Sequence, residues 1–310
     1  MSRKKYIIWN LQGLDSDAIF SCGGCVALRT LFQNLKDLGE DVRLAFKEEQ
    51  KVLGLKPYKD EDFFSLEEHA IITNSHNLNL EEYIAIYPEV TEGNPLGCKK
   101  VVRWLLNTPG NFFVNSMPPV YGENDILFSF EDWVTDESVK KGYKVEKELL
   151  RTLHVDFDIF KDEKAYRHGA CHIFKKSEMT DNEVSQYANT LRGSLDIGPY
   201  TKDPKALAKV FNIFDTFYCF DNKSYLSVLA ALCGCNSVVI GDKKSKTTTE
   251  QYYESRQEFW KYGVGYSDNI EVSKGYSRAN KYLMKSKLIE EQEACLSTVK
   301  NFIKFTQEEI

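Results

Sequence analysis

An anion-binding segment is predicted where an apolar strand over 216–220 runs into a helix over 223–233. Asp221 stands at the carboxyl end of this strand, and Ser224 and Tyr225 stand at the start of the helix. The unpaired backbone N–H groups of a first helical turn, together with the positive end of the helix dipole, favour a phosphate group. Asp221 could equally cap the helix. The two roles are compatible, because the Ser224 hydroxyl can add a further donor.

Two adjacent glycines, Gly23 and Gly24, stand where another helix begins, after a short strand over 5–9 and a polar loop. Because glycine carries no Cβ, the backbone at this place can approach a phosphate closely. The pattern is not G-x-G-x-x-G, so it is a weak signal for dinucleotide binding, and a steric turn is the alternative interpretation.

Two cysteine pairs raise other chemistry: Cys22 and Cys25 form a C-x-x-C pair, and Cys233 and Cys235 form a C-x-C pair. The first pair could be redox-active, since a helix N-terminus stabilises thiolates, and the two pairs together could bind zinc. Both readings are disfavoured, because a long loop precedes Cys22 and nothing in the sequence brings the pairs together. We expect reduced thiols that mostly pack as small hydrophobic residues.

Alternating strands and helices would position these residues. In the first half, a helix with apolar residues at helical spacing ends at Gly39, and residues 47–82 form an irregular insertion. Further strands are expected at 41–46, 83–89, 125–130 and 153–159, and a helix at 96–107.

The same rhythm restarts after the charged segment 161–164, where we place the domain boundary. Strands are expected at 165–174, 195–197, 216–220 and 237–241, helices at 181–192, 203–212 and 223–233, and a mostly helical chain after 247. This alternation predicts parallel sheets. The fold class is therefore α/β, with two Rossmann-like domains facing a cleft and ligands at the carboxyl ends of the strands.

The composition is that of an ordinary soluble globular protein: 310 residues, 42% hydrophobic and 28% charged. The formal net charge of -6 gives no basic field, which disfavours nucleic acid as a partner. No apolar run approaches the ~20 residues of a membrane span, and the first residues lack the apolar core of a signal peptide. We expect a cytoplasmic protein.

Segment 217–240 resembles the nucleotide-sugar-binding stretch of glycosyltransferases with the two-domain GT-B architecture, and the run Leu-Ala-Ala-Leu-Cys-Gly at 229–234 matches the end of their helix. Retaining members carry two glutamates separated by seven residues. Here Asp221 and Leu229 hold those positions, so the second carboxylate is missing and we expect inversion. Segments 86–110 and 260–266 are similar to parts of bacterial surface-polysaccharide (capsule or lipopolysaccharide) glycosyltransferases.

The resemblance implies an acceptor domain over 1–163, a nucleotide-sugar domain over 164–280, and a C-terminal helix over 281–310 that crosses back to the first domain. It implies a hexosyl- or deoxyhexosyltransferase that uses a nucleoside-diphosphate sugar. It also implies that basic residues of the second domain neutralise the diphosphate, with Lys176 as the first choice. The implied donor-binding residues are Gly23, Gly24, Arg167, Lys175, Lys176, Asp221, Ser224 and Tyr225.

A base must deprotonate the acceptor hydroxyl in such an enzyme. Glu89 stands at the end of a predicted strand, where a Rossmann-like active site would lie. Asp15, Asp17, Glu92 and His76 are the other options. We therefore expect Glu89 to be the catalytic residue.

No metal and no cofactor is expected, since Asp-x-Asp triplets at 15–17, 60–62 and 156–158 fall outside the nucleotide-sugar domain. The expected partners are the donor and a glycan or lipid-linked acceptor, with peripheral contact at the inner face of a membrane. Two alternatives stay open. One is a catalytically inactive homologue that binds glycan or a partner transferase. The other is a different nucleotide-dependent Rossmann enzyme, disfavoured by the absence of a glycine-rich fingerprint.

Overall fold

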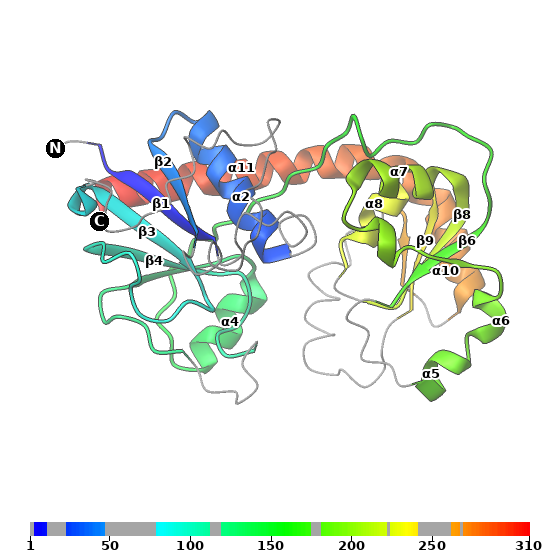
Figure 1. Cartoon of the computed structure of the whole chain (residues 1–310), viewed down its shortest axis with the longest axis horizontal. Coiled ribbons are helices and arrows are strands. Elements are labelled where there is room, and N and C mark those ends of the chain that lie inside the picture. The colour runs from blue at the N-terminus through cyan, green and yellow to red at the C-terminus, as the bar shows by residue number, and fades with distance from the viewer. Residues whose placement is uncertain are drawn as a thin grey trace, which may run out of the picture. The chain divides into compact units, whose positions relative to one another are not determined.

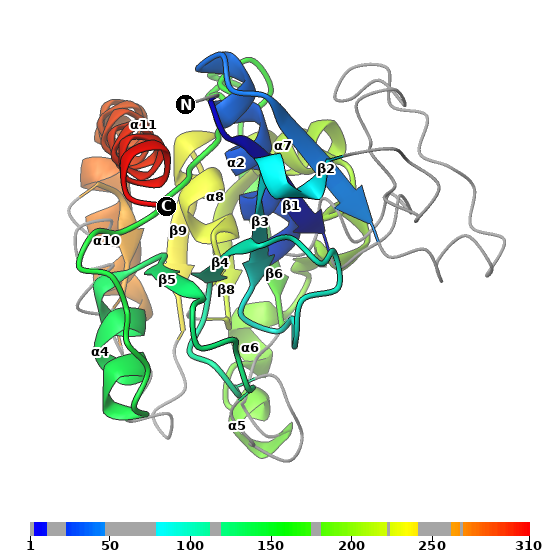
Figure 2. The ribbon, with the colours of Figure 1, turned by 90° about the vertical axis from the view of Figure 1, so that its left-hand side faces the viewer.

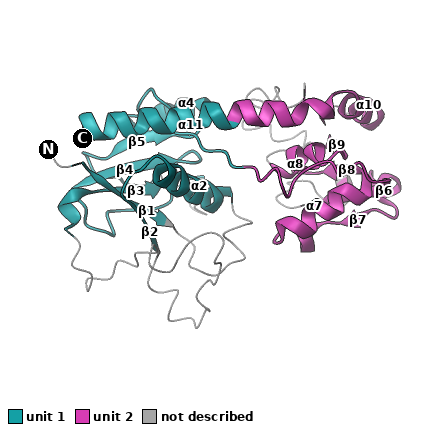
Figure 3. Ribbon diagram, turned by 90° about the horizontal axis from the view of Figure 1, so that it is seen from above, with its two compact units in different colours: residues 1–154, 292–310 teal, residues 155–291 magenta. Residues whose placement is uncertain are grey.

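The computed structural model describes residues 3–10, 23–46, 79–111, 119–174, 181–221, 224–240, 262–266 and 269–310. By its contacts the chain divides into two compact units, which are coloured separately in Figure 3. Unit 1 comprises Met1–His154 and Gln292–Ile310, and unit 2 comprises Val155–Glu291. The charged segment 161–164 therefore belongs to unit 2.

Unit 1 is built on a parallel sheet in the order β2-β1-β3-β4-β5, which Figure 2 shows as a fan of strands. The strands are β1 (Lys5–Asn10), β2 (Val42–Phe46), β3 (Tyr83–Pro88), β4 (Lys100–Leu105) and β5 (Ile126–Ser129). In the central strands Ile8 lies opposite Leu44 on one side and Ile86 on the other. A parallel sheet of this kind is stable when both of its faces are covered.

One face of this sheet packs against two helices, α2 (Gly23–Asp37) and the later part of α11 (Met284–Glu308). The apolar side chains of α2 recur at helical spacing and are buried: Leu28, Leu31, Phe32 and Leu35. Burial of each such side chain contributes about 1.5–3 kcal/mol. Helix α2 is terminated at Gly39, as the sequence predicts. Gly39 adopts a φ of +82°, and its N–H donates to the Lys36 carbonyl.

The other face carries Ile7, Ala85, Tyr87 and Val101, and the segment between β3 and β4 lies over it through Leu96 and Cys98. Helix α4 (Asp132–Lys140) follows β5, and its Val134 packs beside Leu105 and Leu127. Both faces of the central strands are therefore buried.

The prediction of a helix over 96–107 is wrong, because the structure has the central strand β4 there. Val101, Val102 and Leu105 have a spacing that fits one face of a helix. In the strand they point to opposite faces instead, and both faces are buried. A strand covered on both sides shows no alternation of polar and apolar residues, so its periodicity does not identify it.

Unit 2 contains a second parallel sheet, in the order β10-β9-β8-β6-β7 (Figure 1). Its strands are β6 (His168–Ile173), β7 (Leu195–Asp196), β8 (Phe214–Cys219), β9 (Asn236–Val239) and β10 (Val264–Gly265). Its helices are α5 (Asp181–Ser185), α6 (Ala188–Leu191), α7 (Pro204–Ile213), α8 (Leu226–Leu232) and α10 (Ile270–Asn280). Gly234 ends α8 with a φ of +89°.

Two further expectations are corrected in this unit. The helix expected over 181–192 is two short helices, α5 and α6, separated at residues 186–187. The strand expected over 153–159 is absent, and a turn stands in its place because the Asp156 side chain accepts hydrogen bonds from the N–H groups of Asp158 and Ile159. Such a local side-chain bond competes with strand pairing.

The two sheets share one topology. Numbered along the chain, the strands of each sheet run 2-1-3-4-5, which is a doubly wound order. The prediction of an α/β fold with two Rossmann-like domains is confirmed. In this topology the direction of winding reverses between the first and third strands, which are β1 and β3 in unit 1 and β6 and β8 in unit 2. Ligands of doubly wound sheets bind outside the carboxyl ends of the strands at this switch point.

The C-terminal helix α11 returns to unit 1, as expected from the sequence: its residues up to 291 belong to unit 2 and the rest to unit 1. The Thr306 hydroxyl lies 2.7 Å from the Tyr6 hydroxyl, and the Gln307 side chain bonds both the N–H and the carbonyl of Lys4. None of the helices in the described part of the chain is long and apolar enough to span a bilayer.

Replacing Phe302 by alanine should lower the free energy of unfolding by about 3–5 kcal/mol, because it opens a cavity in the core of unit 1. The ring is 1% exposed and lies 5.2 Å from the Phe128 ring and 6.0 Å from the Tyr6 ring. Urea unfolding measures the loss. Lys300→Ala, at an exposed position of the same helix, is the control and should change it by less than about 0.5 kcal/mol. Equal effects of the two substitutions would contradict the packing described here.

Candidate functional site

The carboxyl edge of the unit 2 sheet is formed by the chain that leaves β6 and β8. The first residues after these strands, Phe174 and Phe220, stack with their ring centroids 4.4 Å apart, and Tyr187 meets the Phe220 ring edge-on. Asp221 follows directly on the β8 side. Lys175 and Lys176 follow directly on the β6 side but lie outside the described residues. The switch point of unit 2 is thus flanked by Asp221, one of the residues that the sequence singled out.

A tight turn places Asp221 and Ser224 at this edge. The Asp221 carbonyl accepts the Ser224 N–H at 3.2 Å and the Cys219 thiol at 3.1 Å, and Asp221 is 6% exposed. The Ser224 hydroxyl oxygen accepts the Leu226 N–H at 3.3 Å and so closes a side-chain turn just before helix α8, whose N-cap residue is Tyr225. Helix α8 therefore begins at Leu226 and not at residue 223 as predicted. Ser224 and Tyr225 are half-buried at its start.

The buried thiols of Cys219 and Cys233 are unreactive near neutral pH. The seven cysteines that the structure describes are buried and in no disulfide bond, as expected, while Cys22 lies outside the described residues. Burial raises the pKa of both Cys219 and Cys233 to about 12. Both therefore stay protonated near neutral pH, and the Cys219 thiol acts as a hydrogen-bond donor beneath the Asp221 turn. A thiolate would be needed for redox or metal chemistry.

Arg167 lies at the opposite end of the sheet, because it precedes β6. Its guanidinium donates to the Asp162 carboxylate at 2.8 Å, to the Asn212 side chain at 2.9 Å and to the Cys233 carbonyl. The structure therefore does not bring Arg167 together with Ser224. Burial pushes the pKa of Asp162 upward, but hydrogen bonds from Lys164 and Arg167 outweigh it and bring that pKa to about 2.

A matching edge occurs in unit 1, where Glu89 directly follows β3 and Gly23 and Gly24 begin α2. The Leu106 N–H donates to the Glu89 Oε2 at 3.1 Å, and a Cβ on Gly24 would stand 3.5 Å from the Leu106 side chain. The structure thus brings Glu89 and Gly24 to a common neighbour. Glu89 is 4% exposed.

Of the remaining candidates for the base, the structure describes Glu92 alone. Glu92 is exposed on the loop after β3, and Asp15, Asp17 and His76 lie outside the described residues. Among the described residues no group of three or more His, Cys, Asp and Glu could hold a metal ion.

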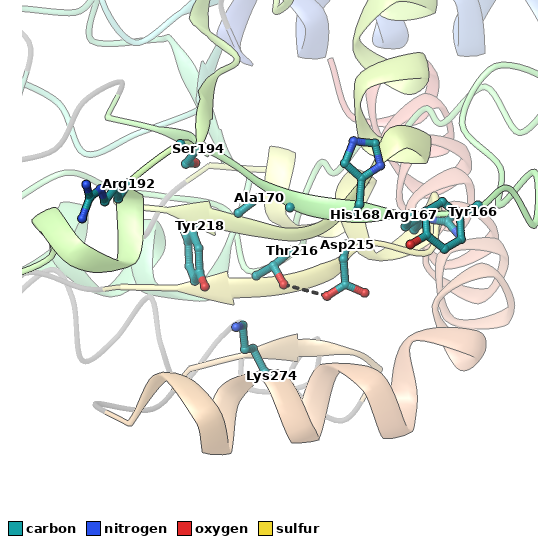
Figure 4. Close-up of a pocket in the computed structure, with 12 residues that line it drawn as sticks. Tyr166, Arg167, His168, Ala170, Arg192, Ser194, Asp215, Thr216, Tyr218 and Lys274 are labelled. Atoms are coloured by element: carbon teal, nitrogen blue, oxygen red, sulfur yellow. Dashed lines mark hydrogen bonds between the residues drawn. The ribbon is translucent and has the colours of Figure 1, made fainter.

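A pocket of about 460 Å³, absent from the sequence-based expectations, lies on one face of the unit 2 sheet over β6 and β8 (Figure 4). Lys274 reaches into it from α10, 5.7 Å from the centre of the Tyr218 ring and 3.4 Å from Glu271. Burial lowers the pKa of Lys274, but Tyr218 and Glu271 raise it more, so the side chain stays cationic. On the floor, the Thr216 hydroxyl donates to Asp215 at 3.0 Å.

This pocket is distinct from the carboxyl edge, because its other wall is built by Arg192 and Ser194 before β7. Of the predicted donor-binding residues that the structure describes, Arg167 lines it and the others do not. Sequence reasoning missed Lys274 because it stands four residues from Ile270 on an ordinary amphipathic helix, and the Tyr218 ring beside it comes from another segment.

No family model matches the chain, and no curated protein matches it. Among solved structures, the chain is similar to spinosyn forosaminyltransferase SpnP, with 12% identity and a TM-score of 0.39. The alignment covers 98% of this chain and 95% of that chain. A TM-score of this size describes a loose likeness, so the functional assignment rests on the residues of this chain.

Arg167→Met should lower the free energy of unfolding by about 1–3 kcal/mol at pH 7, because it removes charge-assisted hydrogen bonds. The folded pKa of Asp162, about 2, lies below the unfolded value of about 4. The contribution of the ion pair is therefore full above pH ~4 and is lost as the pH falls toward the folded pKa. Urea unfolding at pH 7 and pH 3 should show a smaller effect at pH 3. Exposed Arg192→Met is the control, and equal losses from both substitutions at pH 7 would refute the assignment.

Gly23→Ala should change stability by less than about 0.5 kcal/mol, since Gly23 is the first residue of α2 and its replacement meets no steric conflict. Gly23 has no positive φ, and no described atom lies within 4 Å of the place its Cβ would take. If the open backbone serves a ligand, the same substitution should weaken the binding of a nucleoside diphosphate. Thermal unfolding and calorimetry separate these effects. A large loss of stability would instead favour the steric-turn interpretation.

Proposed function

We propose that this chain is a GT-B glycosyltransferase that moves a sugar from a nucleoside-diphosphate sugar to a hydroxyl of a glycan or lipid-linked acceptor. The observation that carries the proposal is the place of the Asp221 turn. It lies at the carboxyl end of β8, beside the β6–β8 switch point of a doubly wound sheet. It also falls within the segment 217–240 that resembles the nucleotide-sugar-binding stretch of this class.

Unit 2 would hold the donor. The Lys176 ammonium, with Lys175 next to it in the sequence, would neutralise the diphosphate as a point charge, and the positive end of the α8 dipole would favour the same anion. The Ser224 hydroxyl and Tyr225 would line the same place, and the Asp221 carboxylate would accept a hydroxyl of the donor. With this charge supplied by the protein, no metal ion is required. Arg167 is assigned a structural role, because its donors are directed to Asp162, Asn212 and Cys233.

Unit 1 would hold the acceptor and the base. The acceptor oxygen attacks the anomeric carbon, the bond from that carbon to the diphosphate oxygen breaks, and the Glu89 carboxylate takes the proton of the acceptor hydroxyl. Gly23 and Gly24 would keep the same edge open to the donor. The product is inverted in this scheme, because Leu229 stands where retaining members have their second carboxylate. The proposed setting is surface-polysaccharide synthesis at the cytoplasmic side of a membrane, with transfer of a hexose or deoxyhexose.

Calorimetric titration with UDP-glucose, dTDP-rhamnose and GDP-mannose tests the class and the donor together. We expect one of them to bind, and Ser224→Ala and Lys176→Ala should each weaken that binding by about 1–3 kcal/mol if they meet buried phosphate charge. Lys209→Ala, at an exposed position in the second half of α7, which leads into the amino end of β8, is the control and should bind as the unaltered chain does.

The alternatives predict other outcomes of the same titration. Binding of NAD(P) or S-adenosylmethionine in place of any sugar nucleotide would identify a different Rossmann enzyme. An inactive homologue, which the leucine at position 229 favours, would show weak or no donor binding and no donor hydrolysis over long incubation. Unchanged affinity in both substituted proteins would remove Ser224 and Lys176 from the site.

A further inference from the structure

Arg103 is a buried cation inside the central strand β4 of unit 1. Its side chain is 1% exposed, and its Nε donates to the Asp125 Oδ2 at 2.7 Å. The guanidinium also lies between two aromatic rings, 4.8 Å from the centre of the Tyr87 ring and 5.0 Å from that of Tyr121. Burying an ion pair costs about as much as it returns, and apolar residues often replace such pairs without loss of stability. The role of Arg103 is therefore better inferred from the hydrogen bonds of its guanidinium than from the energy of its ion pair.

The two remaining nitrogen atoms of Arg103 hold the loop that follows β3. Nη1 donates to the Thr91 carbonyl at 2.8 Å, and Nη2 donates to the Gly93 carbonyl. Gly93 adopts a φ of +64°, a left-handed conformation that suits glycine. One planar guanidinium thus joins β4, the Asp125 carboxylate and two points of the loop.

This loop begins with Glu89, whose own main chain is held from the same side. The Tyr121 hydroxyl donates to the Glu89 carbonyl at 2.6 Å, while the Leu106 N–H donates to the Glu89 carboxylate. Burial raises the pKa of Tyr121 well above its ordinary value, so this hydroxyl stays protonated and remains a donor. Both the backbone and the side chain of Glu89 therefore have fixed partners.

The far end of the loop is tied to β3 itself. The Tyr87 hydroxyl donates to the Asn94 Oδ1 at 2.8 Å and accepts the Leu96 N–H at 2.8 Å. Arg103 supplies the bonds between these two ends, at Thr91 and Gly93. The loop is thus fastened at its start, its middle and its end, and Arg103 is the residue that holds the middle.

We infer that Arg103 is a positioning residue for Glu89: its guanidinium fixes the loop so that the carboxylate stays at the carboxyl edge of the unit 1 sheet. The inference rests on the proposed function, in which Glu89 is the base. Lysine cannot replace Arg103, because a single ammonium cannot present donors in the planar fork that reaches Asp125, Thr91 and Gly93 together.

Steady-state hydrolysis of UDP-glucose, dTDP-rhamnose or GDP-mannose, whichever the chain turns over, tests this role, with water as the acceptor. Arg103→Lys should lower kcat by about 10- to 100-fold, because a small displacement of a reacting group has effects of this size. The donor KM should change less than about twofold, because unit 2 holds the donor. Arg43→Lys, on edge strand β2 of the same sheet, is the matched control and should leave kcat and KM unchanged.

A double-mutant cycle with Glu89→Gln decides whether the two residues act through one step. The doubly substituted protein should have the kcat of Glu89→Gln alone, within about twofold. Three results would overturn the positioning role while leaving Glu89 as the base. They are a doubly substituted protein in which the two losses of kcat multiply, an unchanged kcat in folded Arg103→Lys, and a rise in donor KM alone. Full activity of Glu89→Gln, or turnover of no sugar nucleotide by the unaltered chain, would instead overturn the proposed function, and the inference with it.

Hydrogen–deuterium exchange supplies a readout that does not depend on turnover. In Arg103→Lys the amides of residues 89–96 should exchange faster, while those of strand β6 in unit 2 keep their rates. Unchanged exchange over 89–96 would overturn the inference. If Arg103→Lys fails to fold, Tyr121→Phe keeps the ring against the guanidinium and removes the bond to the Glu89 carbonyl. It should lower kcat at constant donor KM, and full activity of this variant would contradict the positioning of Glu89 by this hydrogen-bond network.

Discussion

Parallel hydrogen bonding between strands is the constraint on which the rest of the molecule depends. Each neighbouring pair of strands in the two described sheets is parallel. Parallel strands need crossovers, and crossovers bring each strand back in the same direction. All strands of a sheet therefore end at one edge, where separate loops meet. Asp221 and Glu89 lie at the carboxyl edges of their sheets for this reason, although their neighbours in sequence have little in common.

The same constraint explains what the sequence could and could not reveal. Gly39 and Gly234 mark helix ends through their own conformational freedom, so both boundaries are readable locally. Strand β4 is not readable, because its two buried faces remove the alternation that identifies a strand, and Arg103 interrupts the apolar run with a charge. Asp156 similarly turns a stretch that is apolar enough for a strand into a turn by bonding to its own backbone.

The residues of the candidate site likewise fall into those that the sequence can place and those that it cannot. Residues within two positions of the end of a strand, such as Asp221 and Glu89, can be placed from the sequence because the end of the strand fixes their position. The role of Arg167 cannot, since its partners Asp162, Asn212 and Cys233 come from three other parts of unit 2. Arg103 is hidden in the same way, because its partners lie on two loops that only the folded sheet brings together.

Helix α11 has a consequence for how the chain is made. Val299 and Phe302 lie in the same buried cluster as Tyr6 and Phe128, so the core of unit 1 is completed by residues that follow unit 2 in the chain. On the ribosome, the unit whose synthesis starts first is then the last to be finished. Unit 2 is a continuous stretch of chain and can fold before unit 1 is complete. Until α11 is synthesised, one apolar face of the unit 1 sheet stays uncovered, and a chaperone could protect it from aggregation.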